Sequence, residues 1–131
     1  KDDVYTFTKA VNTVTVDDGD TTTEEIGLYK GVAAVVGLNK DITIRAADKS
    51  LKLNAVNTTS RNSAIGMYTK KKIDAVAKDI SIDAKSSVGD VYGIYIHEGG
   101  KAAITGNVSI LAKQGEMVLR MESNCITAVP R

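Results

Sequence analysis

YGIYIHEGGKAAITGNVSILA, residues 92–112, is one copy of a unit that the chain repeats, and this repetition decides the fold. IGMYTKKKIDAVAKDISIDA, residues 65–84, aligns with it when a gap of one residue is allowed, and IGLYKGVAAVVGLNKDITIRA, residues 26–46, gives another copy. Each copy has an apolar-Gly-apolar-Tyr start, a small apolar middle and an [Asp/Asn]-[Ile/Val]-[Thr/Ser]-Ile-x-Ala end. NTVTVD, residues 12–17, repeats the end in part.

The ends of the copies predict β-strands. They align two apolar columns with a hydroxyl column between them: Val14, Ile42, Ile80 and Val108; Thr15, Thr43, Ser81 and Ser109; Val16, Ile44, Ile82 and Ile110. Strict alternation of apolar and polar β-branched residues has the period of a strand with one buried face, and no helical period competes with it.

The spacing of the copies predicts how these strands pair. Gly27 and Gly66 are 39 residues apart, and Gly66 and Gly93 are 27 apart, which is too far for hairpin neighbours. Equivalent strands still pair in parallel if each copy is one coil of a β-solenoid, stacked at about 4.8 Å per coil. The sequence therefore predicts an all-β parallel β-helix of about three to four coils. The extra residues of the first interval form an outward loop, in which residues 51–55 could add a short strand and residues 57–63 form a polar turn. A β-sandwich and a Greek-key barrel stay open as alternatives, but neither requires a three-part motif to recur in order.

The composition agrees with a core of small and β-branched side chains. The 131 residues are 43% hydrophobic but include five Tyr, one Phe and no Trp, which suits the narrow interior of stacked coils. No apolar run approaches the roughly 20 residues of a membrane span, so no direct membrane insertion is expected. Because the repeats start almost at once, we expect the chain to be part of a longer protein.

The repeated x-Gly-[Ile/Met/Leu]-Tyr and [Asp/Asn]-[Ile/Val]-[Thr/Ser]-Ile-x-Ala motifs, with many Thr, Asn, Gly and Asp, resemble the passenger region of Gram-negative autotransporter adhesins over roughly residues 4–122. The resemblance implies a right-handed parallel β-helix of the pectin-lyase-like type, secretion, display on the bacterial cell surface, and adhesion or biofilm roles. We therefore expect a β-helix repeat region over residues 1–122. Residues 123–131, SNCITAVPR, depart from the repeat and are expected to be a cap, the start of an atypical coil or an added tail.

Three features contain residues that could act in catalysis or metal binding, but each favours a structural interpretation. His97 lies in the variable turn HEGG after the first strand of a copy, with no nucleophile or orienting group nearby in sequence. Cys125 has neither a disulfide partner nor a neighbouring base. Residues 17–25 carry five carboxylates that could bind Ca²⁺, but their spacing is not that of an EF-hand, and an acidic turn is favoured. We therefore expect no catalytic residue, no metal and no cofactor.

The basic run of Lys70, Lys71 and Lys72 could attract an anionic polymer. Three lysines without interleaved aromatic residues or a neighbouring basic stripe make a weak nucleic-acid footprint. A solvated turn is the favoured interpretation, and no nucleic-acid partner is expected.

Two columns of the repeat form the candidate recognition surface, and they contain Gly27, Gly66, Gly93, Tyr29, Tyr68 and Tyr95. If the apolar residues beside them, such as Ile65, Met67, Tyr92 and Ile94, point inward, alternation places the glycines and these tyrosines on the outer face. Stacked tyrosines beside bare backbone would offer a rigid strip for a sugar ring or a partner strand. The alternative is that the tyrosines only shield the sheet, or fill the core with the alternation reversed.

The expected function is a non-catalytic cell-surface adhesin or structural stalk, secreted to the bacterial surface, that mediates attachment or cell-cell aggregation. A repeated sequence without a cluster of converging polar side chains favours a long structural or binding surface over an enzyme active site. A host-surface glycan or protein is the expected partner. Two alternatives are part of a polysaccharide-active β-helix enzyme, and a module that self-associates through exposed coil ends.

Overall fold

The structure is a computed structural model that describes residues 3–17, 31–57, 63–87, 89–97, 99–115 and 117–128. Within these ranges all regular secondary structure is β-strand. The strands are β1 (Asp3–Thr6), β2 (Val11–Val16), β3 (Gly31–Gly37), β4 (Ile42–Asn57), β5 (Ser63–Thr69), β6 (Lys72–Ser86), β7 (Val91–Ile96), β8 (Lys101–Gln114) and β9 (Met117–Ala128).

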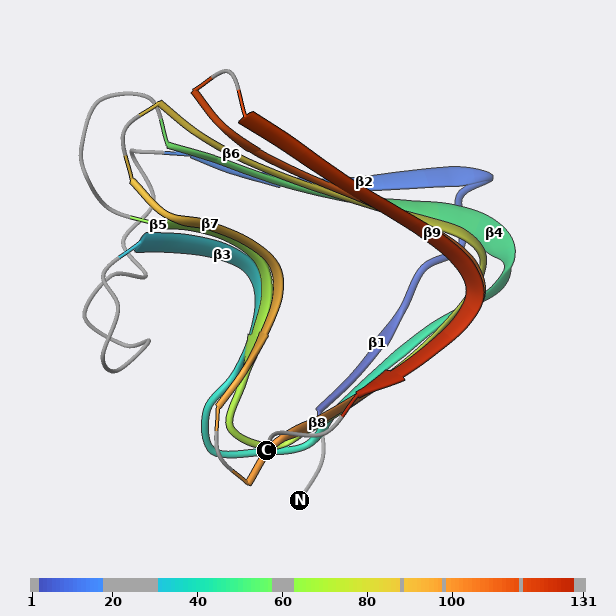
Figure 1. The fold of residues 1–131 in the computed structure, drawn as a ribbon. Coiled ribbons are helices and arrows are strands. Elements are labelled where there is room, and N and C mark those ends of the chain that lie inside the picture. Colours follow the sequence, from blue (N-terminus) through green and yellow to red (C-terminus); the bar gives the residue numbers. More distant parts are fainter. Residues whose placement is uncertain are drawn as a thin grey trace.

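Short and long strands alternate along the chain from β3 to β8 and belong to two sheets (Figure 1). The long strands β4, β6 and β8 form a parallel sheet, which β1 and β2 extend beyond β4 and β9 extends beyond β8. The short strands β3, β5 and β7 form a second parallel sheet. The predicted all-β fold with parallel pairing of repeated strands is confirmed, and it is compatible with a β-solenoid.

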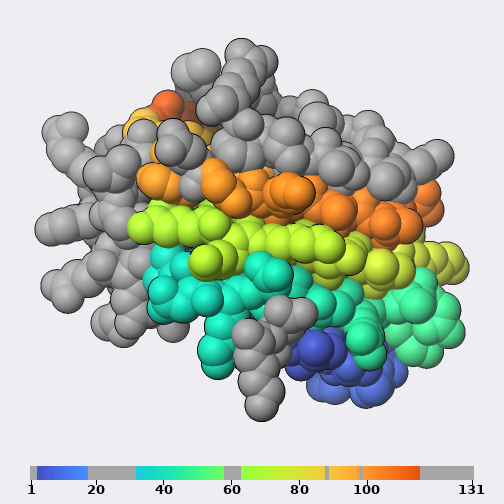
Figure 2. Space-filling model, turned by 90° about the horizontal axis from the view of Figure 1, so that it is seen from below, coloured from blue at the N-terminus to red at the C-terminus, as the bar shows by residue number. Residues whose placement is uncertain are grey.

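Each long strand bends at a corner, so that the larger sheet has two limbs that both face the smaller sheet (Figure 1). The pairing register of β4 with β6 shifts between Ala46 and Ser50, and that of β6 with β8 shifts between Val76 and Asp79. A bulge bends a strand and increases its twist, which accounts for the corner. Figure 2 shows the strands stacked in the order of the sequence, from blue to orange.

The core lies between the two sheets and consists of stacked columns of aliphatic side chains. Leu53 pairs with Ile82, and Ile82 pairs with Ile110, so that one column continues through three long strands. Leu53 and Ile82 are at most 1% exposed. Burying an aliphatic side chain of this size contributes about 1.5–3 kcal/mol, so these columns hold the two sheets together.

The predicted register is wrong for the first copy. Ile42 pairs with Ile73 rather than sharing a column with Ile80, and Leu51 takes the place beside Ile80. Residues 51–55 are a strand, but they form the second limb of β4 with Leu51 and Leu53 in the core, and not a strand in an outward loop. The physical reason is that each long strand carries two alternating apolar stretches on either side of a register shift. The first stretch of β4 can therefore be aligned with either stretch of β6 without changing which residues face the interior.

The predicted start of the first copy is also misplaced. β5 pairs with residues 31–37, which brings Ala33 beside Ile65 and Val36 beside Tyr68. The motif over residues 26–29 is therefore not the neighbour of Ile65 to Tyr68 in the sheet. Gly27 and Tyr29 lie outside the described residues.

The last strand, β9, differs from the others because it pairs antiparallel with β8. It crosses the expected boundary between residues 122 and 123 within one strand. Cys125 lies in this strand opposite Thr105. The assignment of residues 123–131 as a cap or tail stays a prediction.

Candidate functional site

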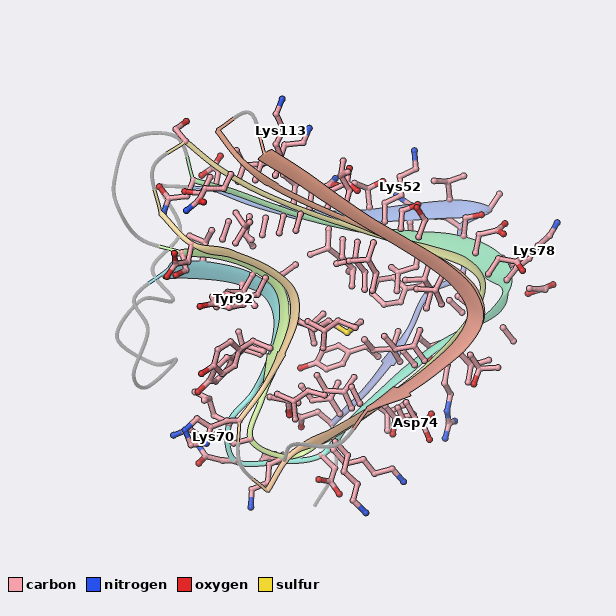
Figure 3. The ribbon with its side chains drawn as sticks, in the orientation of Figure 1. Lys52, Lys70, Asp74, Lys78, Tyr92 and Lys113 are labelled. Carbon is pink, nitrogen blue, oxygen red and sulfur yellow. The ribbon has the colours of Figure 1, made fainter. Side chains whose placement is uncertain are left out.

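The predicted recognition surface corresponds to a tyrosine cluster on the smaller sheet. The rings of Tyr68 and Tyr95 are stacked with their centroids 5.3 Å apart, and Tyr92 meets Tyr95 edge-on at 4.9 Å. Ala33 and Ile65 pack in the same cluster. Figure 3 shows Tyr92 on the side of the sheet that faces away from the long strands.

Tyr68 and Tyr95 lie on the face of the smaller sheet opposite Met67 and Ile94, but they do not form an exposed strip. Tyr68 is 0% exposed, and Tyr92 and Tyr95 are half-buried. Ile65 and Tyr92 were expected to point inward, yet they belong to this outer cluster. No ligand contacts Tyr68 without first displacing the side chains that cover it. Binding through the remaining tyrosines stays a prediction.

The expected outward position of Gly66 and Gly93 is wrong. A Cβ added at Gly66 would collide with Ile82 and with the carbonyl oxygen of Gly93, and one added at Gly93 would collide with Ile110. Both glycines therefore face the larger sheet, where the absence of a side chain lets the two sheets approach closely. Met67, the next residue, also packs into the core between the sheets. Two successive inward positions break strict alternation, which is why the glycines and tyrosines do not share a face.

The Tyr68 side chain carries a hydroxyl that is buried without a hydrogen-bond partner among the described residues. Desolvation by burial disfavours the phenolate and so raises the pKa of Tyr68. A group in this state stabilises neither the fold nor a ligand through its oxygen. The cluster is better described as a packed aromatic layer than as a binding strip.

The turn that contains His97 follows β7, as predicted from the repeat. It stacks on the turn that contains Lys70, because the His97 backbone N donates to the Thr69 carbonyl over 2.8 Å and the Lys101 backbone N donates to the Lys71 carbonyl over 3.0 Å. The repeat alignment places residues 97–100 at the position of residues 70–72, so the stacking of these two turns follows the repeat. The pairing of β6 with β8 adds that Lys72 lies beside Lys101.

A cavity of about 260 Å³ opens among the first four strands and was not marked by any sequence motif. Its lining is apolar and consists of Tyr5, Phe7, Val14, Ala34, Val35, Val36, Ile42, Ile44 and Leu53. It continues the interior between the two sheets at the β1 end of the stack. Tyr5 at its rim is 50% exposed.

The acidic stretch predicted as a solvated turn falls on residues 17–25, of which only Asp17 lies within the described part of the chain. Across the described residues, no group of three or more His, Cys, Asp or Glu side chains could hold a metal ion. These residues also include no helix with the length and apolarity that crossing a membrane requires.

Comparisons with protein-family models, with curated proteins and with solved structures each gave no match. The function is therefore argued from the fold and from the residues that it exposes.

Proposed function

We propose that this chain is a segment of a right-handed parallel β-helix that acts on a bacterial surface as a non-catalytic adhesin or structural stalk. The observation that carries the proposal is the parallel stacking of repeated strands, in which β4, β6 and β8 lie in one sheet and β3, β5 and β7 in the other. Such a stack grows by adding similar units and presents long, regular outer faces. These properties suit a structural stalk and a surface that attaches to other cells.

The chemistry of the outer faces also supports this proposal. Arg45, Val76 and Thr105 share one outward column of the larger sheet and have no chemistry in common. Catalysis requires titratable groups that converge on one reacting atom. Mixed outward columns favour recognition of a surface by many weak contacts.

The experiment uses beads coated with the purified chain, applied to cultured epithelial cells, with albumin-coated beads as the control. We expect saturable attachment that soluble chain competes away. Absence of attachment by a folded chain would leave the stalk role and reject the adhesin role. Release of reducing ends from an acidic polysaccharide in the presence of Ca²⁺ would instead support the enzyme alternative and contradict the proposal.

A second candidate function is self-association, and the β1 end of the stack favours it. Val4, Tyr5 and Val11 on the two edge strands are 50–53% exposed beside the apolar cavity. An exposed edge strand with apolar side chains is a template for pairing with another chain. A second copy docking there would cover both the edge and the mouth of the cavity.

A further inference from the structure

Five basic side chains from two separate turns meet at one corner of the stack, and this basic corner is defined by Lys70, Lys71, Lys72, His97 and Lys101. Lys72 and Lys101 pair in register at the start of β6 and β8. Parallel neighbours in a sheet lie about 4.8 Å apart, so two ammonium groups emerge side by side. Figure 3 shows Lys70 projecting outward at the same corner.

Within the described residues, the basic corner is largely exposed and its lysines form no ion pair. Lys71, Lys72 and Lys101 are exposed, and Lys70 and His97 are half-buried. Among the described lysines, the ion pairs are Lys40 with Asp3 and Lys49 with Asp48, so none involves the corner. Like charges placed side by side on neighbouring strands destabilise a sheet, and a bound anion would relieve this repulsion.

Two acidic residues border the corner without neutralising its ammonium groups. The Asp41 carboxylate accepts a hydrogen bond from the backbone N of Lys72 over 3.0 Å. Asp74 follows Lys72 by two residues on the outer side of β6 (Figure 3). Neither forms an ion pair with Lys71, Lys72 or Lys101 in the described part of the chain. Glu98, which the turn also carries, lies outside the described residues.

The backbone beneath the corner is held rigidly. The Thr69 hydroxyl donates to the Lys71 carbonyl over 2.6 Å and accepts from the Lys71 backbone N over 2.8 Å. Gly100 is buried so closely against the Thr69 and Lys71 carbonyls that it leaves little room for a Cβ. A turn fixed in this way presents its lysines without a large loss of backbone entropy on binding.

We propose that the basic corner binds an acidic polysaccharide, and this inference rests on the proposed role of the chain in surface attachment. Lysine ammonium groups act as compact point charges without the planar fork of arginine, which suits sulfate or carboxylate groups spaced along a flexible polymer. Proteins that bind single-stranded nucleic acid combine such charges with exposed stacking rings. Here the nearby Tyr68 is buried and Tyr95 is stacked on it, so a sugar polymer is the favoured ligand.

The test measures binding of the full chain to biotinylated dextran sulfate, with uncharged dextran as the matched polymer. The variant K72Q/K101Q removes the paired lysines of the corner. The control K85Q/K113Q removes another exposed pair that is in register between β6 and β8, at the opposite end of the same two strands. Both variants lose the same net charge, and thermal unfolding checks that both remain folded.

We expect the wild-type chain to bind dextran sulfate and not dextran, and its affinity for dextran sulfate should fall as the salt concentration is raised. K72Q/K101Q should bind about 10- to 30-fold more weakly, whereas K85Q/K113Q should stay within about threefold of the wild type. No binding to dextran sulfate, or equal losses in both variants, would overturn the proposal. Tighter binding to oligothymidylate that disappears in K72Q/K101Q would also overturn it, because the ligand would then be nucleic acid.

The bead assay separates this inference from the proposed function. If wild-type and K72Q/K101Q beads attach to cells equally well, the adhesin role holds and the basic corner is not its ligand site, which overturns the inference. If wild-type beads do not attach but dextran sulfate still binds through Lys72 and Lys101, the adhesin role fails and the binding site is supported.

Discussion

Tyr68 shows how one residue can be positioned by packing rather than by its polar chemistry. Its ring stacks on Tyr95 within an apolar cluster, while its hydroxyl is buried with no hydrogen-bond partner in the described part of the chain. A hydroxyl removed from water without a new hydrogen bond destabilises the folded state. The aromatic ring is what the fold uses at this position.

Replacing Tyr68 with Phe should therefore raise the free energy of unfolding by about 1 kcal/mol, because the unpaired oxygen is removed and the ring is kept. Urea denaturation at pH 7 measures the difference. Tyr95→Phe is the control, since Tyr95 is half-buried and makes further interactions; it should be neutral or destabilising. A loss of stability in Tyr68→Phe would mean that the hydroxyl has a partner.

The same residue predicts a dependence on alkaline pH. Burial raises the pKa of Tyr68, so the unfolded chain releases this proton at a lower pH than the folded chain does. Stability should be unaffected by Tyr68 below about pH 10 and should fall as pH rises above it. Tyr68→Phe should show a shallower fall than the wild type over this range, and identical slopes would contradict the assignment.

At the scale of an element, the long strands are each built from two alternating stretches joined at a corner. In β4 the first stretch contains Ile42 and Ile44, and the second contains Leu51 and Leu53. Both stretches face the interior because the register shift between Ala46 and Ser50 turns the corner without exposing either apolar set. One strand thus contributes to two walls of the core.

Leu53→Ala should lower the free energy of unfolding by about 2–5 kcal/mol, because it leaves a cavity in the column that Leu53 forms with Ile82. Lys52→Ala, which changes the exposed neighbour, should stay within about 0.5 kcal/mol. Urea denaturation of the two variants provides the comparison. Small and similar effects would place residues 51–55 in an outward loop, as the repeat alignment predicted.

At the scale of the whole molecule, the stack has two different ends. β9 is the edge strand at one end of the larger sheet and pairs antiparallel with β8, whereas β1 and β2 lie at the other end beside the apolar cavity. Apolar side chains on an edge invite pairing with another chain, and lysine on an edge opposes it. We therefore place the proposed self-association at the β1 end.

The double variant Val4→Lys and Val11→Lys should reduce any rise of light scattering with protein concentration. The matched control is Val76→Lys combined with Thr105→Lys, because these two residues face outward in the middle of the larger sheet and add the same charge. Equal effects of both variants would ascribe the change to net charge alone. A wild-type chain that stays monomeric at all concentrations would reject self-association.

The sequence by itself determined that the chain forms strands and that repeated strands pair in parallel, because alternation of period two and recurrence in fixed order are properties of the residues alone. Tertiary structure decided the register, the inward position of Gly66 and Gly93, the burial of Tyr68 and the meeting of Lys72 with Lys101. Each long strand carries two alternating stretches with the same pattern, so only contacts between distant segments select one pairing. The side chains that share a corner follow from that pairing.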